Sequence, residues 1–204
     1  MNKIKVAVLV SGGGTNLGAL IKAQSEGIIK SGELSLVISN KVGAYALERA
    51  RMAGIEALTV TKAECGSQEA FEDRLINELQ SRGIELIVLA GFMAILSEKF
   101  TNTFANRIIN VHPSLIPSFC GKGFYGLRVH EAALEYGVKV TGATVHFVNE
   151  IPDGGKIILQ KSVQIKNDDT PETLQRRVME KAEWIILPKA CEIVSKELLK
   201  NKKA

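Results

Sequence analysis

Apolar residues in this chain fall into short continuous runs separated by stretches with helical spacing. The runs at 5–10, 34–39, 57–60 and 86–90, and the run ending at Ile108-Ile109, predict strands. Strands that are apolar at nearly every position are typical of a parallel sheet, because both of its faces are buried. Two more strands are predicted at 141–147 and 157–163, joined by a turn-rich segment at 149–155.

The stretches between the runs repeat apolar residues every three to four positions and predict helices. We expect them at about 17–25, 44–53, 69–82 and 130–136, and from near Asp169 towards Leu199. In the last helix we expect Pro188 to cause a kink, and Trp184, Leu187 and Ile193 to face the core. Repeated strand–helix–strand units predict an α/β fold: a doubly wound, mostly parallel sheet with helices on both faces, in one domain spanning 1–204.

A glycine-rich segment, Ser11-Gly12-Gly13-Gly14-Thr15-Asn16, joins the first strand to the first helix. This geometry directs free backbone N–H groups and the positive end of a helix dipole at an anion. A dinucleotide loop would have a glycine at Leu17, and a Walker A loop would have Lys-Ser or Lys-Thr at 19–20. We therefore expect a monophosphate site, and the alternative is a plain tight turn.

A second polar segment, Asn110-Val111-His112-Pro113, follows the buried run at 108–109. We expect the strand to end there and to open into a loop at the carboxyl edge of the sheet, where α/β folds bind ligands. Asn110 and His112 would point to the same side, since side chains alternate along extended chain. The alternative is a buried structural histidine beside a turn-forming asparagine.

Asp153 lies in the turn between the last two predicted strands, where a carboxylate can face a cleft. A carboxylate beside His112 would raise the pKa of the imidazole and favour its charged form at neutral pH. An imidazolium next to an amide is a suitable pair to stabilise an oxyanion in acyl or formyl transfer. The alternative for Asp153 is an ordinary Asp-Gly turn residue without a chemical role.

Composition limits the partners that this chain can take. The 204 residues carry a formal net charge of +4, which suits small anionic ligands and falls short of a nucleic-acid footprint. The three cysteines are widely spaced and favour a reducing compartment, and no apolar run reaches membrane-spanning length, so we expect a cytoplasmic protein. The spacing of the three histidines does not resemble a metal-ligand set.

Five segments together resemble the phosphoribosylglycinamide formyltransferases, a branch of the folate-dependent formyltransferases. They are Ser11–Leu17, Ala90–Met93, Asn110–Pro117, Thr141–Phe147 and Asp153–Gly155, and the similarity spans nearly the whole chain in order. The resemblance implies a Rossmann-like formyltransferase fold and direct transfer of the formyl group of 10-formyltetrahydrofolate to the amine of glycinamide ribonucleotide in purine biosynthesis. The amino-terminal half would bind the phosphate, and the carboxyl-terminal half would bind the folate and carry out the chemistry.

The resemblance also implies roles for individual residues. Asn110, His112 and Asp153 would be catalytic; Gly14, Thr15, Asn16 and Glu183 would bind the ribonucleotide; Met93, Ala94, Ile95, Leu96, Val148, Asn149 and Glu150 would hold the folate. Without the resemblance, Glu183 would be interpreted as an exposed charged residue on a helix. The resemblance implies that no metal is needed. It leaves open whether the protein is a monomer or a homodimer.

The chain departs from the family pattern at Ala94 and Gln68, where a basic residue is common on the folate side. The segment at 118–128 is glycine-rich and long, and we expect a mobile loop over the substrate or the folate. One alternative function is a formyltetrahydrofolate hydrolase, which uses the same three catalytic residues with water. The other is a non-catalytic module that binds a phosphoribosyl ligand. A methionyl-tRNA formyltransferase would carry a further domain and more positive charge.

Overall fold

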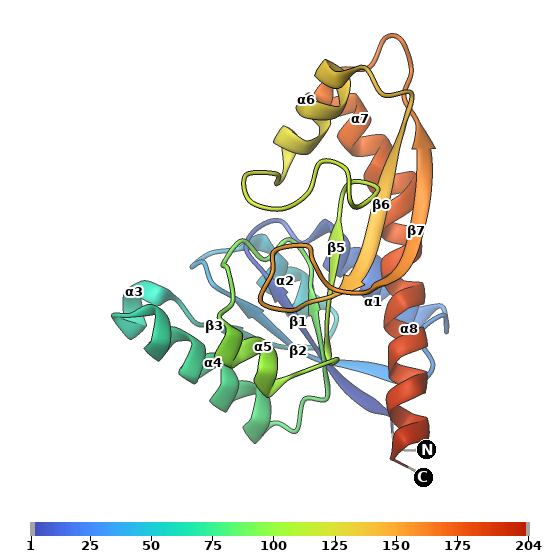
Figure 1. Cartoon of the computed structure of the whole chain (residues 1–204). Helices are drawn as coiled ribbons and strands as arrows, with labels where there is room; N and C mark the ends of the chain where they lie inside the picture. Colours follow the sequence, from blue (N-terminus) through green and yellow to red (C-terminus); the bar gives the residue numbers. More distant parts are fainter. Residues whose placement is uncertain (1–2, 203–204) are drawn as a thin grey trace.

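A seven-stranded sheet organises the molecule (Figure 1), and the computed structural model describes residues 3–202. The strands are β1 (Ile4–Val10), β2 (Gly32–Ser39), β3 (Glu56–Thr59), β4 (Leu86–Leu89), β5 (Ile108–His112), β6 (Val140–Phe147) and β7 (Ile157–Gln164). Their order is β3-β2-β1-β4-β5-β6-β7; the first five run parallel, and β6 and β7 join antiparallel. The predicted doubly wound, mostly parallel sheet is confirmed.

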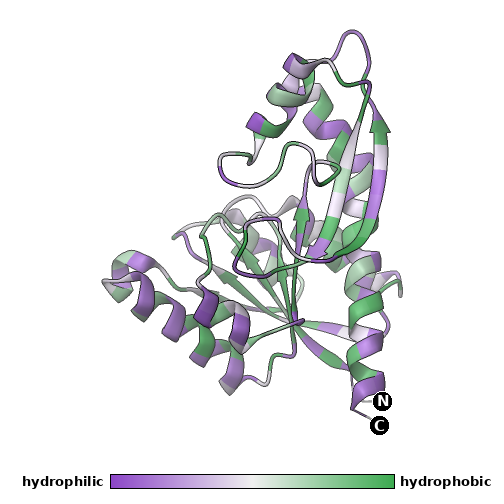
Figure 2. Ribbon diagram, in the orientation of Figure 1, coloured by the Kyte–Doolittle hydropathy of each residue, from purple (hydrophilic) through white to green (hydrophobic). Residues whose placement is uncertain are grey.

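Helices cover both faces of this sheet. They are α1 (Thr15–Ser25), α2 (Tyr45–Met52), α3 (Lys62–Cys65), α4 (Gln68–Ser81), α5 (Glu98–Thr103), α6 (Leu127–Tyr136), α7 (Pro171–Val178), a π-helical turn η1 (Met179–Glu183) and α8 (Trp184–Asn201). Val6 and Val8 of β1 pack in the core beneath α1, α2 and α8, whereas Ala7 and Leu9 pack beneath α4 and α5. This alternation explains why β1 is apolar at consecutive positions. Figure 2 shows the central strands as mainly hydrophobic, while the helices also carry hydrophilic residues.

Two short helices were not predicted. Thr61 caps α3 with a capping box to Glu64, and Ser97 caps α5 by accepting from the backbone N–H of Phe100. Four and six residues are too few to show helical periodicity, so only the caps could have indicated them.

Several predicted boundaries were wrong. β5 does not end at Ile109 but continues through His112, because Asn110 and His112 pair with His146 and Thr144 of β6. Helix α6 begins at Leu127, so Arg128 lies on a helix and not in the preceding loop.

The carboxyl-terminal helix also differs from the prediction. Its irregularity is the π-helical turn, which ends at Glu183, one turn before Pro188, and α8 continues through Pro188. Leu187 is buried as expected and Trp184 is half-buried, but Ile193 is 46% exposed and does not belong to the core. No helix within residues 3–202 is both long enough and apolar enough to cross a membrane.

Candidate active site

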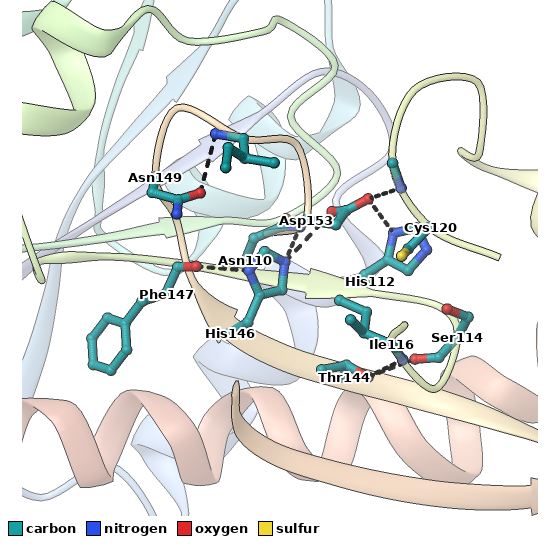
Figure 3. Close-up of polar contacts among 12 residues, drawn as sticks. Asn110, His112, Ser114, Ile116, Cys120, Thr144, His146, Phe147, Asn149 and Asp153 are labelled. Atoms are coloured by element: carbon teal, nitrogen blue, oxygen red, sulfur yellow. Dashed lines mark hydrogen bonds and ion pairs between the residues drawn. The ribbon is translucent and has the colours of Figure 1, made fainter. Parts of the chain in front are cut away.

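Four polar side chains from β5, β6 and the loop after β6 converge at one point (Figure 3). The Asp153 carboxylate lies 3.5 Å from Nδ1 of His112 through Oδ2 and 3.5 Å from Nε2 of His146 through Oδ1. The amide nitrogen of Asn110 lies 3.2 Å from the same Nε2 of His146. The structure thus brings the three predicted catalytic residues together and adds His146.

The antiparallel pairing of β5 and β6 explains this convergence. Asn110 is directly opposite His146, so their side chains meet on one face of the sheet. His112 follows two positions later on the same face, as predicted from the alternation of side chains. The contact of His146 with Asn110 was not predicted, because the cross-strand partner depends on a register that the sequence does not specify.

Backbone carbonyls define the protonation of both rings. Nε2 of His112 lies 2.8 Å from the carbonyl oxygen of Phe119, and Nδ1 of His146 lies 2.7 Å from that of Phe147. A carbonyl can only accept, so each of these ring nitrogens carries a proton. Nδ1 of a neutral His112 is then the bare nitrogen facing Asp153, and Nε2 of a neutral His146 accepts from Asn110.

The expectation of a charged His112 is wrong for this structure. Burial lowers the pKa of His112 below 6.5, and the attraction of Asp153 only partly opposes this shift. Burial would raise the pKa of Asp153, but the adjacent His146 and His112 and the hydrogen bond from the Gly121 N–H together lower it. At neutral pH the pair is therefore a neutral imidazole facing an ionised carboxylate.

The segment after β5 covers this cluster. The Gly121 N–H donates to Oδ2 of Asp153 at 2.8 Å, while the Phe119 carbonyl accepts from His112. Phe119 and Asp153 both have left-handed backbone conformations, with φ of 49° and 56°. Such conformations are costly for non-glycine residues and concentrate at functional sites.

The predicted phosphate loop forms a second polar region at the amino end of α1. Gly14 is in the left-handed conformation with φ 69°, and no side chain caps the helix. A Cβ atom on Gly14 would lie 2.7 Å from Cβ of Ala46, so glycine is required by the close approach of α2. The backbone N–H groups in the first turn of α1 have no acceptor within the helix, which is the arrangement that binds anions.

Glu183 is buried against this loop and is not an exposed helix charge. Nδ2 of Asn16 donates to Oε2 of Glu183 at 2.7 Å, and both residues are buried. Burial raises the pKa of Glu183 to about 7, and the hydrogen bond from Asn16 opposes that shift. Oδ1 of Asn16 is buried and has no hydrogen-bond partner within residues 3–202. A polar pair is thus held next to the loop with capacity to bind one more donor.

The predicted folate segment lines a cavity of about 590 Å³ beyond β4. Met93, Ala94, Ile95 and Leu96 are in its lining, together with Gln68 and Lys62. Val148, Asn149 and Glu150 are not in that lining; Val148 packs against the core beneath α4 and α5, and the Asn149 side chain accepts from the Ile151 N–H. The structure brings only the first part of the predicted set to this cavity.

Two residues that order the site were not predicted. Ser11 joins the glycine loop to the cavity beyond β4, because its hydroxyl accepts from the Met93 N–H at 2.8 Å and donates to Asn40. Glu72 is buried and holds Ser97 and Gln68 beside the cavity. Ser11 was noted only as the first residue of the glycine-rich segment, and Glu72 showed only as a lone acidic residue on the buried face of the helix 69–82.

Comparisons with known proteins show which family this chain belongs to. The sequence profile described as formyl transferase matches residues 4–191. The phosphoribosylglycinamide formyltransferase of Haemophilus influenzae is 43% identical over 184 residues, which are 90% of this chain and 84% of that protein. The crystal structure of glycinamide ribonucleotide transformylase 1 from Symbiobacterium toebii has a TM-score of 0.89 at 43% identity, covering 96% of this chain and 89% of that one.

Other relatives are longer than this chain. The chicken trifunctional purine biosynthetic protein adenosine-3 is 45% identical over 95% of this chain, but the match covers only 19% of that protein. The chloroplastic phosphoribosylglycinamide formyltransferase of Arabidopsis thaliana is 39% identical over 86% of this chain and 60% of its own length. This chain therefore spans a fifth to three fifths of these two curated relatives.

Proposed function

The chain belongs to the formyl transferase family of enzymes, and on that premise we propose that it formylates glycinamide ribonucleotide with 10-formyltetrahydrofolate in purine biosynthesis. The observation that carries the proposal is that one domain holds two polar sites. One is the cluster of Asn110, His112 and Asp153, and the other is the glycine loop with Glu183.

The cluster suits attack by an amine of the substrate. As the amine bonds to the formyl carbon, the carbonyl oxygen becomes an oxyanion, and the amine proton leaves towards the pair of His112 and Asp153. The bond from carbon to N10 of the folate then breaks, N10 takes up a proton, and the formylated amine is released. No enzyme nucleophile takes part.

His112 and Asn110 are placed to stabilise the oxyanion. The carbonyl oxygen of Phe119, 2.8 Å from Nε2 of His112, occupies a position where a developing oxyanion would accept the same hydrogen bond. The amide of Asn110 uses one hydrogen towards His146 and has a second one for the substrate. Substrate would therefore take the place of Phe119, which requires the covering segment to move.

We propose that Gly14, Thr15 and Asn16 bind the phosphate and that Glu183 binds the ribose. In this assignment the amino-terminal part of the domain 1–204 holds the ribonucleotide phosphate, and the carboxyl-terminal part holds the folate and the catalytic residues. Met93 to Leu96 would contact the pterin from one side and Val148 to Glu150 from the other. The three cysteines are free, which supports a reducing, cytoplasmic setting, with the enzyme acting as a monomer or homodimer.

The test is a spectrophotometric assay of 10-formyltetrahydrofolate consumption with and without glycinamide ribonucleotide. We expect folate product only when the ribonucleotide is present. Equal product without it would make water the acceptor and the protein a hydrolase. No product in either reaction would indicate that the protein is a non-catalytic module that binds a phosphoribosyl ligand. The buried contact of Glu183 with the glycine loop favours the transferase over the hydrolase, since water as acceptor needs no ribonucleotide site.

Replacement of Asn16 by alanine tests the division of the two sites. We expect Asn16→Ala to weaken ribonucleotide binding by about 10- to 100-fold, because the loss of one hydrogen bond to a charged partner costs about 1.5–3 kcal/mol. Folate binding should stay unchanged. Separate titrations of the two ligands by calorimetry would measure this, and equal losses for both ligands would contradict the assignment.

A further inference from the structure

The glycine loop is held from one side by α2, through one backbone group and one side chain. The N–H of Ala46 donates to the carbonyl oxygen of Gly12 at 3.1 Å, and Nε of Arg49 donates to that of Gly13 at 2.8 Å. Two successive carbonyls of the loop thus point towards α2.

This arrangement decides where the next N–H groups point. In a trans peptide the carbonyl and the following N–H point in opposite directions, and the only cis bond among the described residues is Ile116–Pro117. The N–H groups of Gly13 and Gly14 therefore point away from α2. Within residues 3–202, neither of them donates to a main-chain or side-chain acceptor. They are two free donors with a common direction, which is the basis of a phosphate-binding loop.

The side chain of Arg49 is itself fixed in place. Its guanidinium lies over the ring of Tyr45, 4.9 Å from the centroid, and its Nη1 would lie 3.6 Å from a Cβ on Gly18. Stacking on an aromatic ring restrains the planar group. Nε is then used on a loop carbonyl and not on a carboxylate.

We propose that Arg49 is a positioning residue for phosphate binding, which acts by holding the Gly13 carbonyl and so orienting the Gly14 N–H towards the ligand. This role rests on the proposed function, in which the glycine loop binds the substrate phosphate. It differs from direct attraction between the guanidinium and the phosphate, because it depends on a donor at the Nε position and not on the positive charge.

Three substitutions separate these two roles. In Arg49→Gln the amide nitrogen falls at the chain position of Nε, so the donor remains and the charge is lost. In Arg49→Lys the charge remains and the donor moves one atom further out. In Arg49→Met both are lost while the length of the side chain is similar.

The probe is ribose 5-phosphate, titrated by calorimetry into the wild-type protein and the three variants. We expect Arg49→Gln to bind within about threefold of wild type, and Arg49→Lys and Arg49→Met to bind at least about tenfold more weakly, as expected for one hydrogen bond in a binding site. In steady-state assays, the KM for the ribonucleotide should rise in these two variants, while kcat and the KM for folate stay near their wild-type values.

Two results would overturn the role of Arg49. Wild-type affinity in Arg49→Lys with weak binding in Arg49→Gln would show that charge matters and the donor does not. Equal affinity in all four proteins would show that Arg49 has no part in the site. If wild-type protein did not bind ribose 5-phosphate, no anion site would exist for Arg49 to organise, and the inference would fail. The folate assay with the ribonucleotide is a separate measurement, so that result would not decide the transferase reaction.

Discussion

His112→Ala should lower kcat by about 10²–10³-fold, the usual effect of removing a hydrogen-bond donor aimed at a developing oxyanion. The imidazole is 4% exposed, and its Nε2–H already faces a carbonyl oxygen at hydrogen-bond distance. The donor is thus oriented before substrate arrives. Alanine leaves the position empty, and the substrate oxyanion would then depend on Asn110 alone. Steady-state kinetics with both substrates would measure the loss.

A matched variant separates the loss of the donor from damage to the site. His112→Gln keeps an amide donor of similar reach and should recover part of the lost turnover. Chemical unfolding of both variants would show whether the fold is retained. A kcat for His112→Ala within about threefold of wild type would contradict the role, because an oxyanion donor cannot be removed at so small a cost.

Acid should destabilise the protein through His130, a residue of α6 that the proposed reaction does not use. Its ring is fully buried, and neither ring nitrogen has a hydrogen-bond partner within residues 3–202. Burial, together with the nearby His112, lowers the pKa of His130 to about 4. The unfolded chain takes up this proton near pH 6.5, so the unfolded state binds more protons at pH values between the two pKa values.

The free energy of unfolding should therefore fall as the pH drops from about 6.5 to about 4, with His130 contributing about 3 kcal/mol in total. Its contribution is the difference between wild type and His130→Gln, which keeps a polar side chain of similar size but does not titrate. The pKa of Glu183 is raised to about 7, so protonation of Glu183 increases the free energy of unfolding as the pH drops. This contribution is the same in both proteins and cancels in the difference. Urea unfolding at pH 7, 5.5 and 4 would measure it, and parallel pH profiles for the two proteins would contradict the prediction.

The parts of the fold that depend on local pattern could be predicted from the sequence. The continuous apolar runs identified the parallel strands, because burial on both faces removes the need for polar positions. The helix 69–82 showed its buried face directly, and Phe71, Leu75 and Leu79 are all in the core. The shared face of Asn110 and His112 could be predicted because side chains alternate along any strand, whatever its tertiary contacts.

The rest depends on contacts between distant segments. The pKa of His112 follows from burial beneath the segment around Phe119, which no spacing in the sequence reveals. Ile193 fits the helical stripe of α8 but is exposed. A π-helical turn rotates the residues after it relative to an ideal α-helix, and neither η1 nor its effect on the helix was predicted. Glu183 is the last residue of η1 and is buried. Because the turn was not predicted, the burial of Glu183 was not predicted either.

The hydrogen bond between Asn16 and Glu183 joins residues 167 positions apart, and this has a consequence for biosynthesis. A ribosome completes the glycine loop long before it adds Glu183, so Asn16 lacks its buried partner for most of translation. The same link means that bound nucleotide would fasten α1 to the η1–α8 segment, which should make the latter resistant to limited proteolysis.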